Sequence, residues 1–213
     1  MSQPPLAERL RPQNLEDYIG QKHIIGDKGV LRPAIQAKRL PSMIFWGPPG
    51  VGKTTLAQII ATHLKRPFYA LSAIQSGVKD IREVIDKAKS QSFFGANLPV
   101  LFIDEIHALS SDVQENLYGV MEDFKCTIED KNLQRQRIVN LPRFTLIGAT
   151  THTGDLKAAL LSRFQYKGQL VPYTVDELTN MAITAGDRVY NLDIPEDIAR
   201  RIAQLSRKTA RIC

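Results

Sequence analysis

The chain has 213 residues, and with 43% hydrophobic and 23% charged residues it has the composition of a globular protein, either one large domain or a domain with a small appendage. No apolar run is long enough to span a bilayer, and the first residues, MSQPPLAERLRPQ, lack the apolar core of a signal peptide, which argues against a membrane or secreted protein. The formal net charge of +6 and the pI near 9.4 are compatible with a nucleic-acid partner, although a solvated basic surface accounts for them equally well.

Along the chain, an irregular start gives way to apolar strands that alternate with helices. Proline at positions 4, 5 and 12 interrupts any helix in residues 1–30, so we expect irregular structure there. Apolar runs predict strands over Met43–Trp46, Pro67–Leu71, Pro99–Asp104, Phe144–Gly148 and within Lys167–Val171. Periodicity and capping residues predict helices over Leu31–Lys38, Gly52–Leu64, Val78–Ser90, Ser110–Asp123, Leu156–Leu161, Val175–Tyr190 and Pro195–Ser206. The charged stretch Phe124–Leu141 has β-branched residues on both sides of its centre, which predicts a hairpin.

This alternation predicts an α/β fold, in which a parallel sheet is covered by helices on both faces. Ligands of such sheets bind at the carboxyl ends of the strands, so the loop after Trp46 should share one rim with Asp104 and Thr151. Only helices are expected after Pro172. We therefore predict a nucleotide-binding α/β domain over residues 1–172 and the start of a helical lid over residues 173–213.

A phosphate-binding motif lies between the first predicted strand and the helix that follows it. Residues Gly47–Thr54, GPPGVGKT, fit the pattern G-x-x-x-x-G-K-[ST]. The glycines Gly47, Gly50 and Gly52 let backbone N–H groups approach an anion, and the positive end of the helix faces the same anion. Lys53 adds a point charge for the outer phosphates, and the Thr54 hydroxyl is a hard oxygen ligand for Mg²⁺. The loop therefore predicts a nucleoside triphosphate site.

Two acids, Asp104 and Glu105, end the strand PVLFID and begin the next loop. An acid at this rim can hold Mg²⁺ opposite Thr54, directly or through water, and the second can polarise the attacking water. The alternative is that both merely end a strand, but a complete phosphate loop upstream favours the catalytic interpretation.

Further candidates lie later along the predicted rim. Thr150 and Thr151 close the strand in LIGATT, where a hydroxyl can reach the γ-phosphate or the water, although threonine is common at strand ends. Arg163, in LLSRF, is a candidate arginine finger, acting in cis or from a neighbouring subunit, or an ordinary surface arginine. His107 is more typical of a packing or hydrogen-bonding histidine than of a base, and Arg211 lies in a basic run that a solvated helix face also explains.

Two motifs that the sequence lacks, a guanine-reading motif and a cysteine metal-ligand pattern, narrow the predicted class of protein. The sequence contains no N-K-x-D motif, which argues against a GTPase. The cysteines, Cys126 and Cys213, lie far apart without the spacing of metal ligands, so we expect ordinary thiols in a reducing cytoplasm.

With these residues, the chain resembles AAA+ ATPases over nearly its whole length, and the resemblance is composite. The segments PLAERLRPQNLEDYIGQ, MIFWGPPGVGKTTLA and LSAIQSGVKDIREVI are most similar to the replication-associated recombination ATPases. The segments LFIDEIHALSSDVQENLYGVMEDF, LPRFTLIGATTHTG, LLSRF and TARI resemble the RuvB family of Holliday-junction branch-migration motors.

The resemblance implies a role for each matching position. Leu10 and Arg11 would lie near the adenine, and Gly50, Lys53, Thr54 and Thr55 would hold phosphates, with Thr54 also on Mg²⁺. Asp104 would be the metal-side acid, Glu105 the water-activating acid and Thr151 the first sensor. The remaining implied contacts are Glu122, Asp123 and Phe124 approaching nucleotide from the adjoining region, Arg163 as a finger acting in trans, Tyr173 beside the nucleotide and Arg211 as the second sensor.

The resemblance also implies the assembly and its partners. We expect a Mg-ATP-dependent AAA+ motor of DNA recombination and repair, working as a homo-oligomeric ring, such as a hexamer, on branched or forked DNA. The predicted hairpin reads IEDKNLQRQRIV, without the glycine turn and apolar tip of the RuvB family, which puts a RuvA-like partner in question. Phe124 replaces the family tyrosine. The RuvB family has a winged-helix domain after the position of Cys213, so we expect either a longer protein or one that lacks this domain. A fork-maintenance ATPase and a nucleotide-switched module like a clamp-loader subunit remain alternatives.

Overall fold

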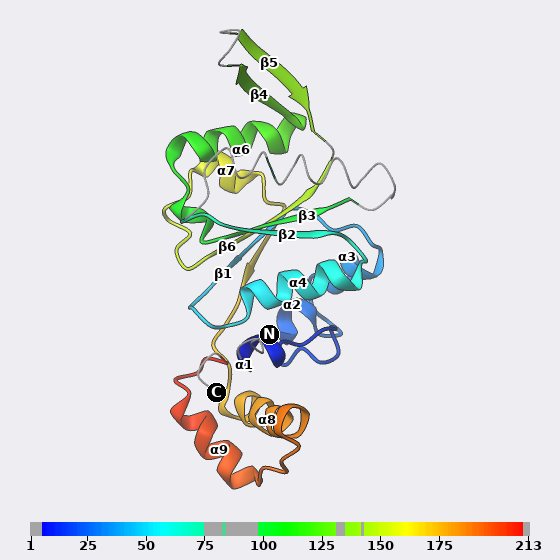
Figure 1. The fold of residues 1–213 in the computed structure, drawn as a ribbon, viewed down its shortest axis with the longest axis vertical. Helices are drawn as coiled ribbons and strands as arrows, with labels where there is room; N and C mark the ends of the chain where they lie inside the picture. The colour runs from blue at the N-terminus through cyan, green and yellow to red at the C-terminus, as the bar shows by residue number, and fades with distance from the viewer. Residues whose placement is uncertain (1–5, 75–82, 84–97, 131–134, 142, 211–213) are drawn as a thin grey trace.

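The computed structural model describes residues 6–74, 83, 98–130, 135–141 and 143–210, and Figure 1 shows the chain as a ribbon. A five-stranded parallel sheet lies at its centre, with the strand order β2-β3-β6-β1-β7. These strands are β1 (Met43–Trp46), β2 (Phe68–Ser72), β3 (Val100–Asp104), β6 (Thr145–Thr150) and β7 (Tyr166–Gln169). In the register of the sheet, Trp46 lies beside Thr150, so the carboxyl ends of β1 and β6 meet at one rim.

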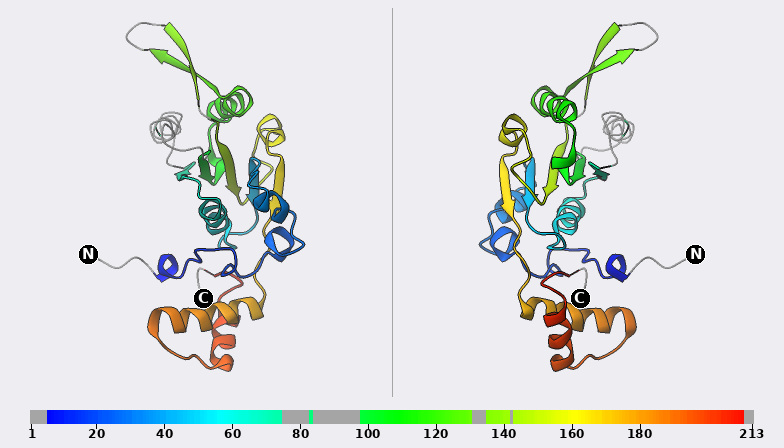
Figure 2. Two further views of the ribbon diagram at one scale, coloured as in Figure 1. Left: turned by 90° about the vertical axis from the view of Figure 1, so that its right-hand side faces the viewer. Right: turned by 90° about the vertical axis from the view of Figure 1, so that its left-hand side faces the viewer.

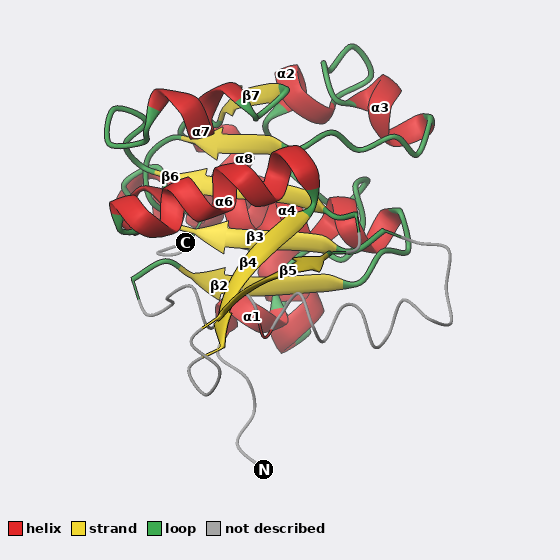
Figure 3. Cartoon of the chain, turned by 90° about the horizontal axis from the view of Figure 1, so that it is seen from above, coloured by secondary structure: helices red, strands yellow, loops and turns green. Residues whose placement is uncertain are grey.

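Alternate residues of the strands enter two separate cores on opposite faces of the sheet. Phe45 of β1 belongs to one core and its neighbour Ile44 to the other, and both side chains are fully buried. In the central strands β1, β3 and β6, this burial on both faces explains why the sequence is a continuous apolar run. The first core is covered by α2 (Lys22–Ile25), α3 (Arg32–Gln36) and α4 (Lys53–His63), and the second by α6 (Ser111–Asp123) and α7 (Ala158–Ser162), as Figures 1 and 3 show.

Two smaller units extend from this sandwich in opposite directions (Figures 1 and 2). Beyond the end of α6, β4 (Lys125–Asp130) and β5 (Arg135–Asn140) form an antiparallel hairpin. At the other end, α8 (Val175–Ala185) continues into a π-helical turn, η2 (Gly186–Tyr190), and packs on α9 (Glu196–Leu205) around a small core of Tyr173, Leu178 and Ala203. None of the helices in the described ranges is long and apolar enough to cross a membrane.

The start of α8 is fixed by a capping box. The Thr174 hydroxyl accepts a hydrogen bond from the Glu177 N–H at 3.2 Å, and the Glu177 carboxylate accepts one from the Thr174 N–H at 2.8 Å. Two otherwise unpaired donors are thereby satisfied, which sets the direction in which the chain leaves the sheet domain.

The predicted α/β fold with a parallel sheet is confirmed, as are the hairpin and every predicted strand, to within one or two residues at each end. The expectation that residues 1–30 are irregular is wrong, because α1 (Leu6–Arg9) and α2 form there. Helices of four residues are too short to produce a periodic apolar pattern. The helix predicted over Val78–Ser90 lies, except for Glu83, outside the described residues.

Candidate nucleotide-binding site

The phosphate loop connects β1 to α4 in a conformation that depends on glycine. Gly47 has φ +149°, and a Cβ there would lie 2.2 Å from the carbonyl oxygen of Leu170. Gly52 has φ +92° and forms the N-cap of α4, where a Cβ would lie 2.5 Å from the Tyr18 hydroxyl and 2.6 Å from that of Tyr173. The loop can therefore pass closely under its neighbours only without side chains, so its backbone N–H groups remain accessible to an anion.

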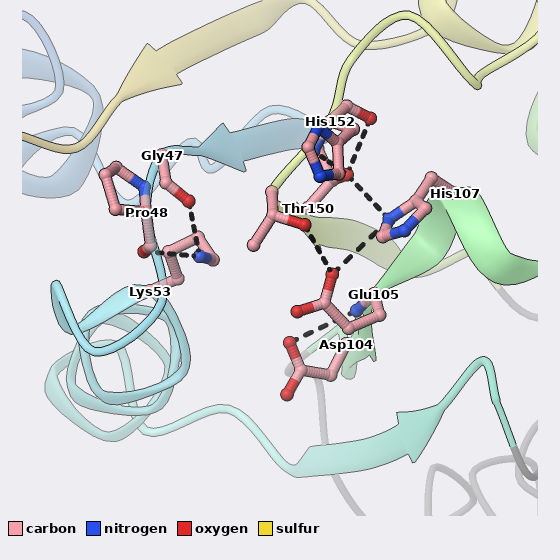
Figure 4. A network of polar contacts seen from close by, with 9 residues as sticks. Gly47, Pro48, Lys53, Asp104, Glu105, His107, Thr150 and His152 are labelled. Carbon is pink, nitrogen blue, oxygen red and sulfur yellow. Dashed lines mark hydrogen bonds and ion pairs between the residues drawn. The ribbon is translucent and has the colours of Figure 1, made fainter. Parts of the chain in front are cut away.

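Lys53 carries the positive charge of this loop. Its side chain is buried, and its ammonium group donates hydrogen bonds to the carbonyl oxygens of Gly47 at 2.8 Å and Pro48 at 2.9 Å (Figure 4). The charge thus lies inside the curve of the loop, next to the first turn of α4, which includes Thr54 and Thr55. The lysine, the helix N-terminus and the glycine-rich backbone are the kinds of group that can bind a multiply charged phosphate chain.

The hydroxyl groups of two tyrosines lie against Gly52 of the phosphate loop. Tyr18 and Tyr173 are both almost fully buried, and the Tyr18 hydroxyl donates to the carbonyl oxygen of Gly52 at 3.3 Å. Burial raises the pKa of Tyr18 well above its usual range, and the neighbouring Tyr173 raises it further. Burial likewise raises the pKa of Tyr173. Both phenol groups are therefore neutral. Tyr173 lies just before α8, so it connects the phosphate loop to the beginning of the helical unit.

The residues predicted near the adenine lie beside α4. Leu10 is half-buried, and Arg11 donates to the side-chain oxygen of Gln58 on α4 at 2.8 Å while pairing with Glu8 at 2.9 Å. The N-terminal segment is therefore attached to the helix that begins at the phosphate loop.

Asp104 and Glu105 lie at the rim where β3 ends, across from the loop (Figure 4). Asp104 accepts a hydrogen bond from the Glu105 N–H at 3.2 Å, and Glu105 has φ +49°, a left-handed conformation that turns the chain sharply after the strand. The Thr54 hydroxyl and the Asp104 carboxylate are oxygen donors of the kind that Mg²⁺ prefers. No group of three or more His, Cys, Asp or Glu side chains that could hold a metal ion occurs among the described residues.

The two threonines that end β6 have different environments. The Thr151 hydroxyl donates to Oε2 of Glu105 at 3.4 Å, so the candidate first sensor lies beside the candidate base. Thr150 is fully buried, and its hydroxyl lies 2.9 Å from Nδ1 of His107. The carbonyl oxygen of Thr150 accepts a hydrogen bond from the Gly47 N–H at 3.2 Å, so the end of β6 also contacts the phosphate loop.

Arg163 is held on the other side of the sheet by residues of α6. Its Nη2 donates to the Tyr118 hydroxyl at 2.6 Å and lies 2.7 Å from Oε1 of Glu122, while Cζ lies 4.6 Å from the centroid of the Tyr118 ring. The hydrogen bond to Tyr118, followed by the charge of Glu122, raises the pKa of Arg163 despite the opposing effect of burial. Nε is buried and has no hydrogen-bond partner in the part of the chain described. The structure therefore brings together two predicted nucleotide contacts, Arg163 and Glu122.

Three predicted site residues remain: Asp123, Phe124 and Arg211. Asp123 is exposed at the end of α6, and Phe124 caps that helix with φ +52° and packs edge-on against Phe144 at 5.8 Å. Within this chain, the Phe124 ring thus contributes to the second core. Arg211 lies outside the described residues.

Sequence reasoning missed the parts played by Tyr18, Tyr118 and His107. Tyr118 and Glu122 are four positions apart on one helix, a spacing that places them on the same face and offered a signal. Tyr18 gave none, because its contact with Gly52 joins distant parts of the chain.

The fold and the site together define a P-loop nucleotide-binding domain of the AAA+ class. The chain belongs to the family of Holliday junction DNA helicase RuvB P-loop domains, which it matches over residues 10–170.

Comparison with individual proteins gives the same family and a second, related one. The chain is 42% identical over 209 residues to the Holliday junction branch migration complex subunit RuvB of Wolbachia sp. subsp. Drosophila simulans (strain wRi), covering 95% of this chain and 62% of that protein. It is 49% identical over 161 residues to replication-associated recombination protein A of Haemophilus influenzae, covering 75% of this chain and 32% of that protein. The resemblance to both families is therefore confirmed.

Solved structures agree with the fold. The Thermotoga maritima RuvB Holliday junction branch migration motor matches with a TM-score of 0.75 at 34% identity, over 96% of this chain and 62% of that one. The chain thus spans less than two thirds of the length of the RuvB proteins that it matches.

Proposed function

We propose that this domain binds and hydrolyses Mg·ATP as the motor of a DNA recombination and repair machine of the RuvB kind, working in the cytoplasm. The observation that carries the proposal is the meeting of Lys53 on the phosphate loop with Asp104, Glu105 and Thr151 at one rim of the sheet. Phosphoryl transfer needs little covalent chemistry from a protein, and these groups supply positioning and charge.

Each group has a distinct part in the proposed reaction. Lys53 and the N–H groups at the start of α4 bind the outer phosphates, and Thr54 and Asp104 hold the metal side of the site. When bound, Mg²⁺ supplies charge neutralisation at the phosphate oxygens. Glu105 accepts a proton from the water that attacks the γ-phosphorus, and Thr151 orients that carboxylate.

The site is incomplete without a second copy of the chain. In this proposal Arg163 acts in trans, because within its own chain it points to Tyr118 and Glu122 on α6 rather than to the phosphate loop. Glu122, Asp123 and Phe124 end the same helix and approach the neighbour's nucleotide from this face. Hydrolysis then depends on assembly into a ring, which we propose is a hexamer.

The helical unit, residues 173–213, acts as a lid over the 1–172 domain in this proposal. Leu10 and Arg11 lie near the adenine, Tyr173 lies beside the nucleotide, and Arg211 serves as the second sensor. Direct packing of Tyr173 against Gly52 gives the lid a route to the phosphate loop.

A second function is favoured by the 49% identity to replication-associated recombination protein A. In that case the same hydrolysis would serve the maintenance of replication forks. A clamp-loader-like module, whose output is partner engagement rather than movement along DNA, is the third alternative.

Branch migration on a four-way junction, with and without RuvA, separates these functions. RuvA-dependent migration supports the RuvB role and docking of RuvA by the hairpin. DNA-stimulated ATP hydrolysis without migration in the presence of RuvA contradicts that role and supports the recombination ATPase. Nucleotide-dependent partner binding with negligible turnover supports the module.

A further inference from the structure

We infer that His107 is the positioning residue for Glu105, holding one oxygen of its carboxylate so that the other faces the attacking water. This inference rests on the proposed function, since it presumes that Glu105 activates water. His107 lies in the 3-10 turn η1 (Ile106–Ala108), which directly follows Glu105, and its side chain is mostly buried, with 20% exposed. Its Nδ1 lies between two oxygens, 2.9 Å from the Thr150 hydroxyl and 3.3 Å from Oε2 of Glu105 (Figure 4).

The proton of the Thr150 hydroxyl decides which way these bonds run. A hydroxyl has one proton to donate, and a backbone carbonyl can only accept. The Thr150 hydroxyl lies 2.8 Å from the carbonyl oxygen of His152, to which it donates, and it accepts from the His152 N–H at 3.0 Å. The third contact, with Nδ1 of His107, must then be donated by the histidine. This assigns the proton of His107 to Nδ1, the nitrogen that also faces Glu105.

With that assignment, the one proton on Nδ1 of His107 lies between the Thr150 hydroxyl, to which it donates, and Oε2 of Glu105, 3.3 Å from Nδ1. Oε2 also accepts a hydrogen bond from the Thr151 hydroxyl at 3.4 Å. Among the described residues, Oε1 accepts no hydrogen bond. Figure 4 shows the carboxylate between the two histidines and the residues of the phosphate loop. One oxygen is therefore anchored, and the other is left to accept a proton.

The anchor is itself fixed to the phosphate loop. Thr150 is fully buried at the end of β6, and its carbonyl oxygen accepts the Gly47 N–H at 3.2 Å. His107 therefore links the position of Glu105 to β6, the strand whose end is hydrogen-bonded to the phosphate loop. A histidine that served only in packing would not need an Nδ1 proton directed at these oxygens.

Two amide variants test the assignment, because they resemble different nitrogens of the ring. The amide nitrogen of Asn lies two bonds beyond Cβ, as Nδ1 does, and that of Gln lies three bonds beyond, as Nε2 does. We expect His107→Gln to lower kcat for ATP about 10- to 100-fold with KM changed less than threefold, since only orientation of the base is lost. His107→Asn should keep kcat within about fivefold of wild type. The exposed His63→Gln, at the end of α4, is the matched control and should leave turnover unchanged.

Equal turnover by the two His107 variants would overturn the inference, as would a loss that appears in KM rather than kcat. If the Tm of His107→Gln shows that it does not fold, the same test compares the kcat of Thr150→Val with that of Thr150→Ser. Only the serine variant keeps the hydroxyl that His107 contacts. Normal turnover by Thr150→Val would then overturn it.

A second background separates this inference from the proposed function. In Glu105→Gln, adding His107→Gln should cause no further loss, because the positioned group is gone. If Glu105→Gln itself turns over normally, the proposed function fails. If Glu105→Gln is inactive while His107→Gln is normal, only the positioning role fails.

Discussion

Substitution of Gly52 by alanine tests how the loop and the lid are packed together. A Cβ at this position would lie 2.5 Å from the Tyr18 hydroxyl and 2.6 Å from the Tyr173 hydroxyl, both too close for any contact to persist unchanged. Both tyrosines are buried, with 7% and 4% of their surface exposed, so neither can swing into solvent without opening the core. The stability of the whole domain should therefore respond to one added methyl group.

Two costs contribute to the expected loss. The φ of +92° at Gly52 costs an alanine about 1–2 kcal/mol. Displacing two buried hydroxyls adds about 1–3 kcal/mol of overpacking. We therefore expect Gly52→Ala to lower the free energy of unfolding by about 2–5 kcal/mol, a large part of the roughly 5–15 kcal/mol that a domain has.

Urea denaturation measures this loss, and a Tyr18→Phe, Tyr173→Phe background provides the control. Without the hydroxyls, the nearest tyrosine atom is Cζ of Tyr18 at 3.4 Å, an ordinary contact. In that background Gly52→Ala should cost only the backbone part, about 1–2 kcal/mol. The same cost in both backgrounds would refute the packing account and leave the backbone conformation as the sole cause.

Three further predictions follow from the site. Lys53→Ala should weaken ATP binding at least about 10-fold in a fluorescent-nucleotide titration, because the buried ammonium is the loop's own cation; unchanged affinity would remove Lys53 from the phosphate site. Arg163→Ala should lower hydrolysis by about 10³–10⁵, and mixing it with Lys53→Ala should restore part of the activity, because each mixed interface can combine an intact loop with an intact arginine. Failure of the mixture to recover contradicts action in trans. The raised pKa of Tyr18 and of Tyr173 means that folding favours their neutral forms, so their stabilising contribution is complete below pH 10 and is lost as pH rises through the folded-state pKa. Alkaline unfolding should therefore move to higher pH in Tyr18→Phe, and an unmoved midpoint contradicts that origin.

Much of the fold and of the phosphate site was predictable because their signals are local. A continuous apolar run marks a strand buried on both faces, and the Gly47–Thr54 motif needs its residues in fixed order to curve around an anion. Asp104 and Glu105 follow from the same rule, since the ends of parallel strands share a rim.

Other features depend on contacts that join distant segments, and no local pattern reports them. The Tyr18 hydroxyl reaches Gly52, and the Arg163 guanidinium reaches Tyr118, across long stretches of chain. His107 was visible in the sequence as a plausible packing residue. Its contact with Thr150 appears only when β3 and β6 lie side by side in the sheet.

The position of Arg163 adds a detail to the proposal that two subunits share each nucleotide site. The sequence suggested an arginine and an acidic helix end as separate contacts with nucleotide, whereas the structure pairs Arg163 with Glu122 at 2.7 Å. In the proposed ring, Glu122 would have to share or release this charge when Arg163 meets a γ-phosphate, so we expect the pair to link assembly to hydrolysis.

The proposed activation of water by Glu105 can be tested by comparing ATP turnover with ATP binding in Glu105→Gln. Phosphate release and nucleotide titration are measured on the same preparations of wild type and variant. We expect Glu105→Gln to bind ATP with wild-type affinity and to hydrolyse it at least about 100-fold more slowly, since it loses the base and keeps the phosphate site. Wild-type turnover by the variant would contradict the account.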